Sequence, residues 1–291
     1  MKPPAFKYIR ARSLEETLSL LADKGAEAKI LAGGQSLVPM MNFRVAQPET
    51  LIDIDRVKEL DYLRLEDSWL QVGARTCQRT LEKSQLVRER CPLLTEAVKW
   101  IGHPQTRNRG TVGGSLVHGD PTAELALVAT LLDARIVLQK KGKSRVVGPA
   151  DFFEDFMATH IAEDELLTEV SFPLSPPRSG YGFRELCIRH GDFAIVAAAV
   201  QLTVGEDGRI SAARIAVSGG GPTALRIDQA EKRLAGQEGK DKAFQEAAAC
   251  VPDAVQPLTD QKASAAYRRE MAKVFVRRAL DDAWSMMGMP K

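Results

Sequence analysis

The chain has 291 residues, of which 44% are hydrophobic, so it is long enough for one large or two ordinary domains with buried cores. Its 40 basic and 38 acidic residues leave a formal net charge of +2. This balance argues against a protein that binds nucleic acid or an anionic membrane through its charge, and the hydrophobic content argues against disorder.

The sequence contains no pattern typical of a signal peptide, a membrane span or a metal site. The first ten residues lack the continuous apolar stretch of a signal peptide, and the apolar run from Phe193 to Val200 is too short to span a bilayer. We therefore expect a cytoplasmic protein with no membrane span. The four cysteines form no C-x-x-C pair and the four histidines lack metal-ligand spacing, so we expect buried thiols and no metal site on this chain.

The first part of the chain alternates between strand and helix patterns. Ser13 and Glu16 form a capping-box pattern before leucines at helical spacing, which predicts a helix up to Gly25. Helical pieces broken at Pro92 are expected over 76–101, and Asp120 followed by proline is typical of a further helix start. Apolar segments predict strands at 28–32, 50–54, 69–73, 135–139, 144–147 and 166–172.

Ser175-Pro176-Pro177 is the clearest linker in the chain. Beyond it we expect strands at 181–188, 195–204 and 209–217, the last two joined by a turn at Gly208, and helices at 228–235, 240–250 and 264–286. The order predicts an α+β fold. One domain would cover 1–175, in parts of about 1–60 and 61–175, and a smaller domain with a three-stranded antiparallel sheet and helices would cover 176–291.

The segment LAGGQSL at residues 31–37 offers bare backbone at the end of a predicted strand. Gly33 and Gly34 would turn sharply and present N–H groups, while Gln35 and Ser36 add side chains that hydrogen-bond phosphate or ribose oxygens. A Gly-Gly pair is more often a simple turn, and the G-x-G-x-x-G spacing of a dinucleotide-binding Rossmann fold is absent. This segment alone therefore leaves both interpretations open.

A second glycine segment, TVGGSLVHGDPTAEL, covers residues 111–125. Two such loops could close on one phosphate-bearing dinucleotide from both sides. Asp120 is better explained as a helix cap, and Glu124 could either accept hydrogen bonds from ribityl hydroxyls or lie on a solvated face. The groups that would meet phosphate are Thr111, Gly113, Gly114 and Ser115.

Four ordered segments carry a more specific signal: AGGQSLVPMMNFR at 32–44, NRGTVGGSLVHGDPTAEL at 108–125, DELLTEV at 164–170 and FRELCIRHGDFAIV at 183–196. Together they resemble the FAD-binding medium subunit of molybdenum hydroxylases. That family includes the medium subunit of aerobic carbon monoxide dehydrogenase and the flavin domain of xanthine dehydrogenase. The resemblance implies a two-part FAD-binding domain of the PCMH/vanillyl-alcohol-oxidase type, followed by a C-terminal domain of the carbon monoxide dehydrogenase flavoprotein type.

The resemblance also implies which residues contact FAD. The first loop would wrap the diphosphate through Leu31, Ala32, Gly33, Gly34, Gln35, Ser36 and Leu37. The second would contribute Thr111, Gly113, Gly114, Ser115, His118 and Glu124. Where some relatives have asparagine and aspartate, this chain has Ser115 and Glu124, which keep a hydrogen-bonding group.

Two further contacts come from later segments. Leu167 would pack against the adenine or the flavin. Arg184 falls where the xanthine dehydrogenase type has a lysine near the flavin, and a cation there would stabilise the anionic reduced flavin. An arginine on an exposed strand edge is also ordinary, so this assignment has a simple structural alternative.

The resemblance implies a chain that holds FAD and needs no catalytic side chain. The [2Fe-2S] clusters and the molybdopterin-molybdenum cofactor would lie on a small and a large partner subunit, in a dimer of heterotrimers. One alternative is a self-sufficient FAD-dependent oxidoreductase, whose proton-transfer residue would be His118, Tyr181 or His190. The other is a binding protein without turnover that takes another nucleotide. The organic substrate and the final electron acceptor are not specified by this sequence.

Overall fold

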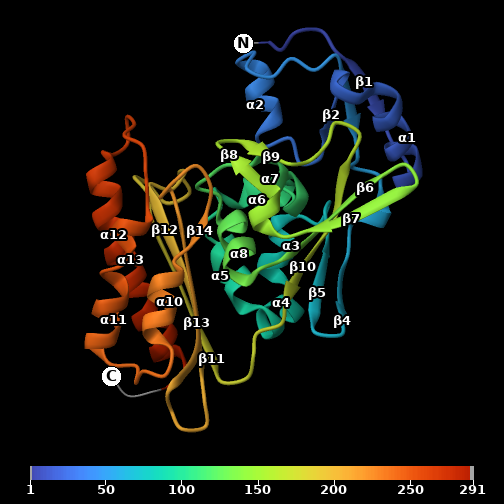
Figure 1. Ribbon diagram of the computed structural model, residues 1–291. Coiled ribbons are helices and arrows are strands. Elements are labelled where there is room, and N and C mark those ends of the chain that lie inside the picture. The colour runs from blue at the N-terminus through green and yellow to red at the C-terminus, as the bar shows by residue number, and fades with distance from the viewer. Residues whose placement is uncertain (1, 289–291) are drawn as a thin grey trace.

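The computed structural model describes residues 2–288, with an N-terminal half built on two large sheets and a C-terminal half built on one (Figure 1). The first sheet is parallel, in the order β1-β3-β2, from Lys7–Arg10, Thr50–Asp53 and Ala28–Leu31. Helices α1 (Leu14–Lys24) and α2 (Leu37–Asn42) connect these strands. The expected cap is confirmed, because the Ser13 hydroxyl accepts a hydrogen bond of 3.1 Å from the Glu16 N–H.

The second sheet is antiparallel and has five strands in the order β4-β5-β10-β6-β7. β4 (Leu63–Glu66) was not expected from the sequence, whereas the expected strands are confirmed as β5 (Trp69–Gly73), β10 (Leu166–Pro173), β6 (Arg135–Lys140) and β7 (Lys143–Val147). A short hairpin, β8-β9, covers Phe153–Asp155 and Ala158–Thr159. The helices of this part are α3 (Gln78–Lys83), α4 (Gln85–Arg90), α5 (Pro92–Val98), α6 (Pro104–Arg109), α7 (Val112–His118), α8 (Glu124–Leu132) and α9 (Pro149–Phe152).

The C-terminal sheet has four antiparallel strands in the order β11-β12-β13-β14, where the sequence predicts three. The strands are Ser179–Leu186, Val196–Val204, Ile210–Ser218 and Leu225–Arg226. The fourth has only two residues, and it pairs with Ala216 and Val217 after the chain turns through Gly219. The helices are α10 (Asp228–Leu234), α11 (Asp241–Ala248), α12 (Val251–Ala254) and α13 (Ala265–Met286).

The C-terminal sheet lies between α13 and the helices α5 and α8 of the N-terminal half (Figure 1). Gly180 and Gly182 of β11 face α13, where a Cβ atom would overlap the carbonyl oxygens of that helix. The alternate residue Phe183 points the other way and shares a core cluster with α8. The two halves are therefore joined by a continuous apolar core, and polar groups on this face of β11 lie between them.

Within residues 2–288, no helix combines the length and the apolar character that crossing a bilayer requires.

Candidate functional site

The first glycine segment lies at the carboxyl end of the parallel sheet. It follows β2, which β3 holds through a hydrogen bond of 3.1 Å from the Ile54 N–H to the Leu31 carbonyl. Gly34 has a φ of 71°, a left-handed conformation that suits glycine. The N–H groups of residues 33–36 donate to no acceptor within the described residues 2–288. They are free to bind an anion.

The side chains of this segment behave differently from one another. The exposed amide of Gln35 donates to the Gly33 carbonyl at 3.3 Å, so it stabilises the loop rather than reaching outward. Ser36 is half-buried and directly precedes α2. The flanking Leu31 and Leu37 are also half-buried, which anchors both ends of the segment.

The second glycine segment is a helix rather than the expected loop. Thr111 caps α7, and its hydroxyl accepts a hydrogen bond of 3.1 Å from the Gly114 N–H. The Gly113 N–H donates to the Ala74 carbonyl at 2.8 Å. The main-chain donors at the start of α7 are thus used inside the protein, which corrects the expectation that they mirror the first loop. What this segment offers a ligand is its surface and its side chains.

The two glycine segments touch. A Cβ atom on Gly33 would collide with the Arg109 carbonyl oxygen and lie 2.9 Å from the Gly110 Cα, just before α7. A Cβ atom on Gly114 would lie 3.8 Å from the Ala32 Cβ. Helical spacing puts Gly114, Ser115 and His118 on one side of α7, and none of these three is fully buried. The free amides of the first segment therefore lie beside an open helix face that carries a hydroxyl and an imidazole.

The chain after α7 differs from the expected helix start. Asp120 does not cap α8, which begins at Glu124 after Ala123. The Asp120 carboxylate instead accepts from the N–H and the hydroxyl of Thr122, both at 2.7 Å, in a local turn. Glu124 is partly buried, and its pKa rises to about 7 because of burial and, to a smaller degree, the charge of Asp120.

Leu167 and Arg184 lie apart from the glycine segments' open face. Leu167 is 2% exposed and belongs to the apolar core that also contains Val112 of α7, so it supports that helix from beneath. The Arg184 guanidinium points to α13, where it pairs with Asp282 through two hydrogen bonds, one of 2.8 Å. Arg184 therefore faces away from the N-terminal half.

The residues considered for proton transfer do not share one environment. His118 ends α7 and is half-buried. Tyr181 is half-buried on β11, and its pKa is raised by burial and by the charge of Glu96. His190 stacks on Trp100, with ring centroids 5.5 Å apart. Among residues 2–288, no three histidine, cysteine or carboxylate side chains are placed to hold a metal ion.

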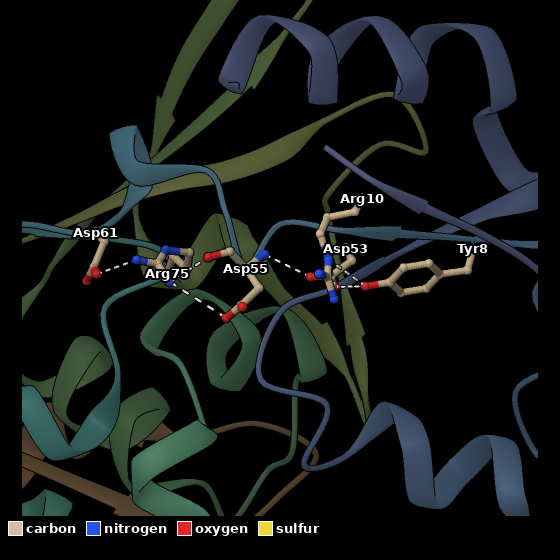
Figure 2. A network of polar contacts seen from close by, with 6 residues as sticks. All are labelled: Tyr8, Arg10, Asp53, Asp55, Asp61 and Arg75. Carbon is tan, nitrogen blue, oxygen red and sulfur yellow. Dashed lines mark hydrogen bonds and ion pairs between the residues drawn. The ribbon is translucent and has the colours of Figure 1, made fainter. Parts of the chain in front are cut away.

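Figure 2 shows a charged network at the edge of the parallel sheet that no sequence motif indicates. Asp53 bonds to the Tyr8 hydroxyl and lies 3.3 Å from the Arg10 guanidinium, and these contacts outweigh burial and lower its pKa. Arg75 donates to the Asp55 carbonyl at 2.9 Å and pairs with Asp61. Because the carboxyl ends of β2 and β3 are neighbours, this network fixes the edge from which the first glycine segment leaves.

A surface hollow of about 690 Å³ adjoins this network and is lined by Arg12, Asp55, Arg56, Lys58 and Arg75. Its four cations come from three segments that lie far apart in the sequence, so no local motif indicates them. Arg75 is paired with Asp55 and Asp61, so the positive charge that would favour an anionic ligand nearby comes from Arg12, Arg56 and Lys58.

Both halves of the chain match known protein families. Residues 4–175 match the family described as the FAD binding domain in molybdopterin dehydrogenase, and residues 181–283 match the CO dehydrogenase flavoprotein C-terminal domain. The chain is 42% identical to the 6-hydroxypseudooxynicotine dehydrogenase complex subunit alpha of Paenarthrobacter nicotinovorans, over 97% of this chain and 96% of the relative. It is 38% identical to the carbon monoxide dehydrogenase medium chain of Hydrogenophaga pseudoflava, over 98% and 99%.

Solved structures share the whole fold. Carbon monoxide dehydrogenase from Hydrogenophaga pseudoflava superposes with a TM-score of 0.95 at 39% identity, covering 98% of this chain and 99% of that one. Quinoline 2-oxidoreductase from Pseudomonas putida 86 superposes with a TM-score of 0.93 at 33% identity, covering 99% and 100%. The chain therefore belongs to the family of FAD-binding medium subunits of molybdenum-containing hydroxylases and dehydrogenases.

Proposed function

We propose that this chain carries FAD in a heteromeric molybdenum hydroxylase, takes electrons from a partner [2Fe-2S] subunit and passes them to an external acceptor. The observation that carries the proposal is the set of N–H groups at residues 33–36 that have no acceptor within the described residues, in a segment that lies beside α7 in a chain of this family. Bound FAD would supply the capacity to accept and release electrons.

The residues fit the diphosphate of FAD in a specific way. Four adjacent main-chain donors, with Gly34 in the left-handed region, suit an anion site, and Arg56 and Lys58 add positive charge at this edge of the sheet. Ser36 and Ser115 can each donate a hydroxyl, and the absence of a side chain at Gly114 leaves room beside Ala32. In this arrangement the first segment binds the diphosphate and α7 forms the opposite wall.

We further propose a small iron-sulfur subunit and a large molybdopterin subunit as partners, in a dimer of heterotrimers. Support comes from the relatives, which are described as a medium chain or as a subunit of a dehydrogenase complex. Their substrates differ, and include nicotine derivatives, caffeine and carbon monoxide. We therefore assign the choice of organic substrate to the large subunit.

The test is to titrate the purified chain with FAD and then to add organic substrate with and without the partner subunits. We expect one FAD per chain, with fast flavin bleaching only when both partners are present. Absence of flavin binding would contradict the proposal. Rapid bleaching by substrate with this chain alone would instead indicate a self-sufficient oxidoreductase, and stopped-flow absorbance distinguishes the two outcomes.

A further inference from the structure

The face of the C-terminal sheet that meets the N-terminal half carries a buried carboxyl group with unmet hydrogen-bonding capacity. Glu185 follows Phe183 on the side of β11 opposite to α13, and it is 6% exposed. Both of its carboxyl oxygens are buried and accept no conventional hydrogen bond from residues 2–288; the Cys187 thiol is the neighbouring weak donor. A buried carboxyl group in this state costs free energy unless a partner is supplied.

A second unsatisfied group lies in the same row of the sheet. The strand register aligns Glu185 with Ala197 and Ala197 with Ser218, so the two polar side chains share one face with only a methyl group between them. Ser218 is fully buried, and its hydroxyl has no partner within the described part of the chain. The next residue, Gly219, donates its N–H to the Pro121 carbonyl at 3.1 Å, which ties this end of the sheet to the segment before α8.

Burial, more than the charges around it, keeps Glu185 neutral. From α8 and the turn before it, Glu124 and Asp120 face this region, and from its own strand the Cys187 thiol does. The cation that acts on Glu124 is Arg107, which is itself bound to Glu82 and to three carbonyl groups. Burial, and then the charge of Glu124, raises the pKa of Glu185 to about 9, so it holds a proton at neutral pH.

We propose that Glu185 is a neutral carboxylic acid that donates a hydrogen bond to the polar edge of the bound isoalloxazine. This inference rests on the proposed function, because Glu124, across from Glu185, belongs to the segment that we assign to FAD. The pyrimidine edge of a flavin carries both acceptors and donors, which matches the hydroxyl and the carbonyl of a neutral carboxylic acid. The residue thus positions the ring without entering the chemistry.

The first test concerns protonation and needs no flavin. Infrared spectra of the full-length chain at pH 8, above the pKa of about 7 of Glu124, should contain the carbonyl stretch of a protonated carboxylic acid, and this band should be largely lost in Glu185→Gln. The exposed Glu163 provides the matched control, since Glu163→Gln should leave the band in place. A spectrum without the band, or a band that persists in Glu185→Gln, would overturn the proposal.

The second test measures FAD affinity by flavin fluorescence. Glu185→Gln keeps a neutral donor and should bind within about twofold of wild type, whereas Glu185→Leu should lose about tenfold, the equivalent of one hydrogen bond. Wild-type affinity should fall as the pH rises past about 9, and Glu185→Gln should remove that fall. Equal affinity in all three proteins would overturn this inference alone. Failure of wild type to bind FAD would overturn the proposed function together with it.

Discussion

Replacing Gly33 by alanine should push the two glycine segments apart. The new Cβ atom would collide with the Arg109 carbonyl oxygen and lie 2.9 Å from both the Arg109 carbonyl carbon and the Gly110 Cα. Carbon atoms pack best at about 3.5 to 4.0 Å, so the backbones must separate by roughly 0.5 to 1 Å. We expect about 1–3 kcal/mol of lost stability, as for overpacking in a core. FAD affinity should fall at least about tenfold, since hydrogen bonds to the diphosphate lengthen together.

Urea unfolding of the apo chain and fluorescence titration with FAD would measure these two effects. Gly142→Ala is the control for backbone strain, because Gly142 has a φ of 74° and no atom within 4 Å of its Cβ position. Gly34→Ala shares that strain, with a φ of 71°, but lies in the proposed diphosphate site. Both should lose about 1 kcal/mol of stability, while only Gly34→Ala should weaken FAD binding. Unchanged FAD affinity in Gly33→Ala and Gly34→Ala would refute this reasoning.

Three other changes have expected outcomes. The free energy of unfolding of the wild-type apo chain should fall as pH rises from about 4.5 to about 9, because the folded state binds the Glu185 proton more tightly than the unfolded chain does. Glu185→Gln should make this pH dependence less steep. An equally steep fall in the variant would count against a raised pKa of Glu185. Arg107→Gln should cost about 1–3 kcal/mol in urea unfolding, since the Lys99, Ile101 and Gly102 carbonyls lose their buried donor while Arg79 still pairs with Glu82, and a loss below about 0.5 kcal/mol would contradict that role. Arg184→Gln should cost less than about 1 kcal/mol and leave FAD affinity unchanged, because the ion pair with Asp282 is largely exposed; a tenfold weaker affinity would place Arg184 at the flavin after all.

Periodicity was a sound guide to most of the fold, because long apolar patterns reflect burial that the structure confirms. The predicted helix at residues 264–286 and the strands at 195–204 and 209–217 lie within a residue or so of their observed bounds. The strand β1 was not expected, since Lys7–Arg10 is mostly exposed and carries no apolar signal. The two-residue strand β14 is too short for any periodicity, and its existence depends on pairing with β13.

The site was only partly predictable, because glycine reveals where backbone is bare but not where its N–H groups point. The Gly113 N–H donates to the carbonyl of Ala74, which is far away in the sequence. Only the folded structure shows that this N–H is not available to bind an anion. Asp120 bonded to the nearer Thr122 instead of capping α8. The inward direction of Glu185 is set by the phase of β11, which the contact of Gly180 and Gly182 with α13 fixes.

Comparing FAD with riboflavin as ligands of the purified chain tests the central claim most directly. Riboflavin has the same ring system but no diphosphate, so it cannot use the free N–H groups of residues 33–36. We predict that FAD binds at least about a hundredfold more tightly, a difference of about 3 kcal/mol. Affinities within twofold of each other would contradict a diphosphate held by these amides.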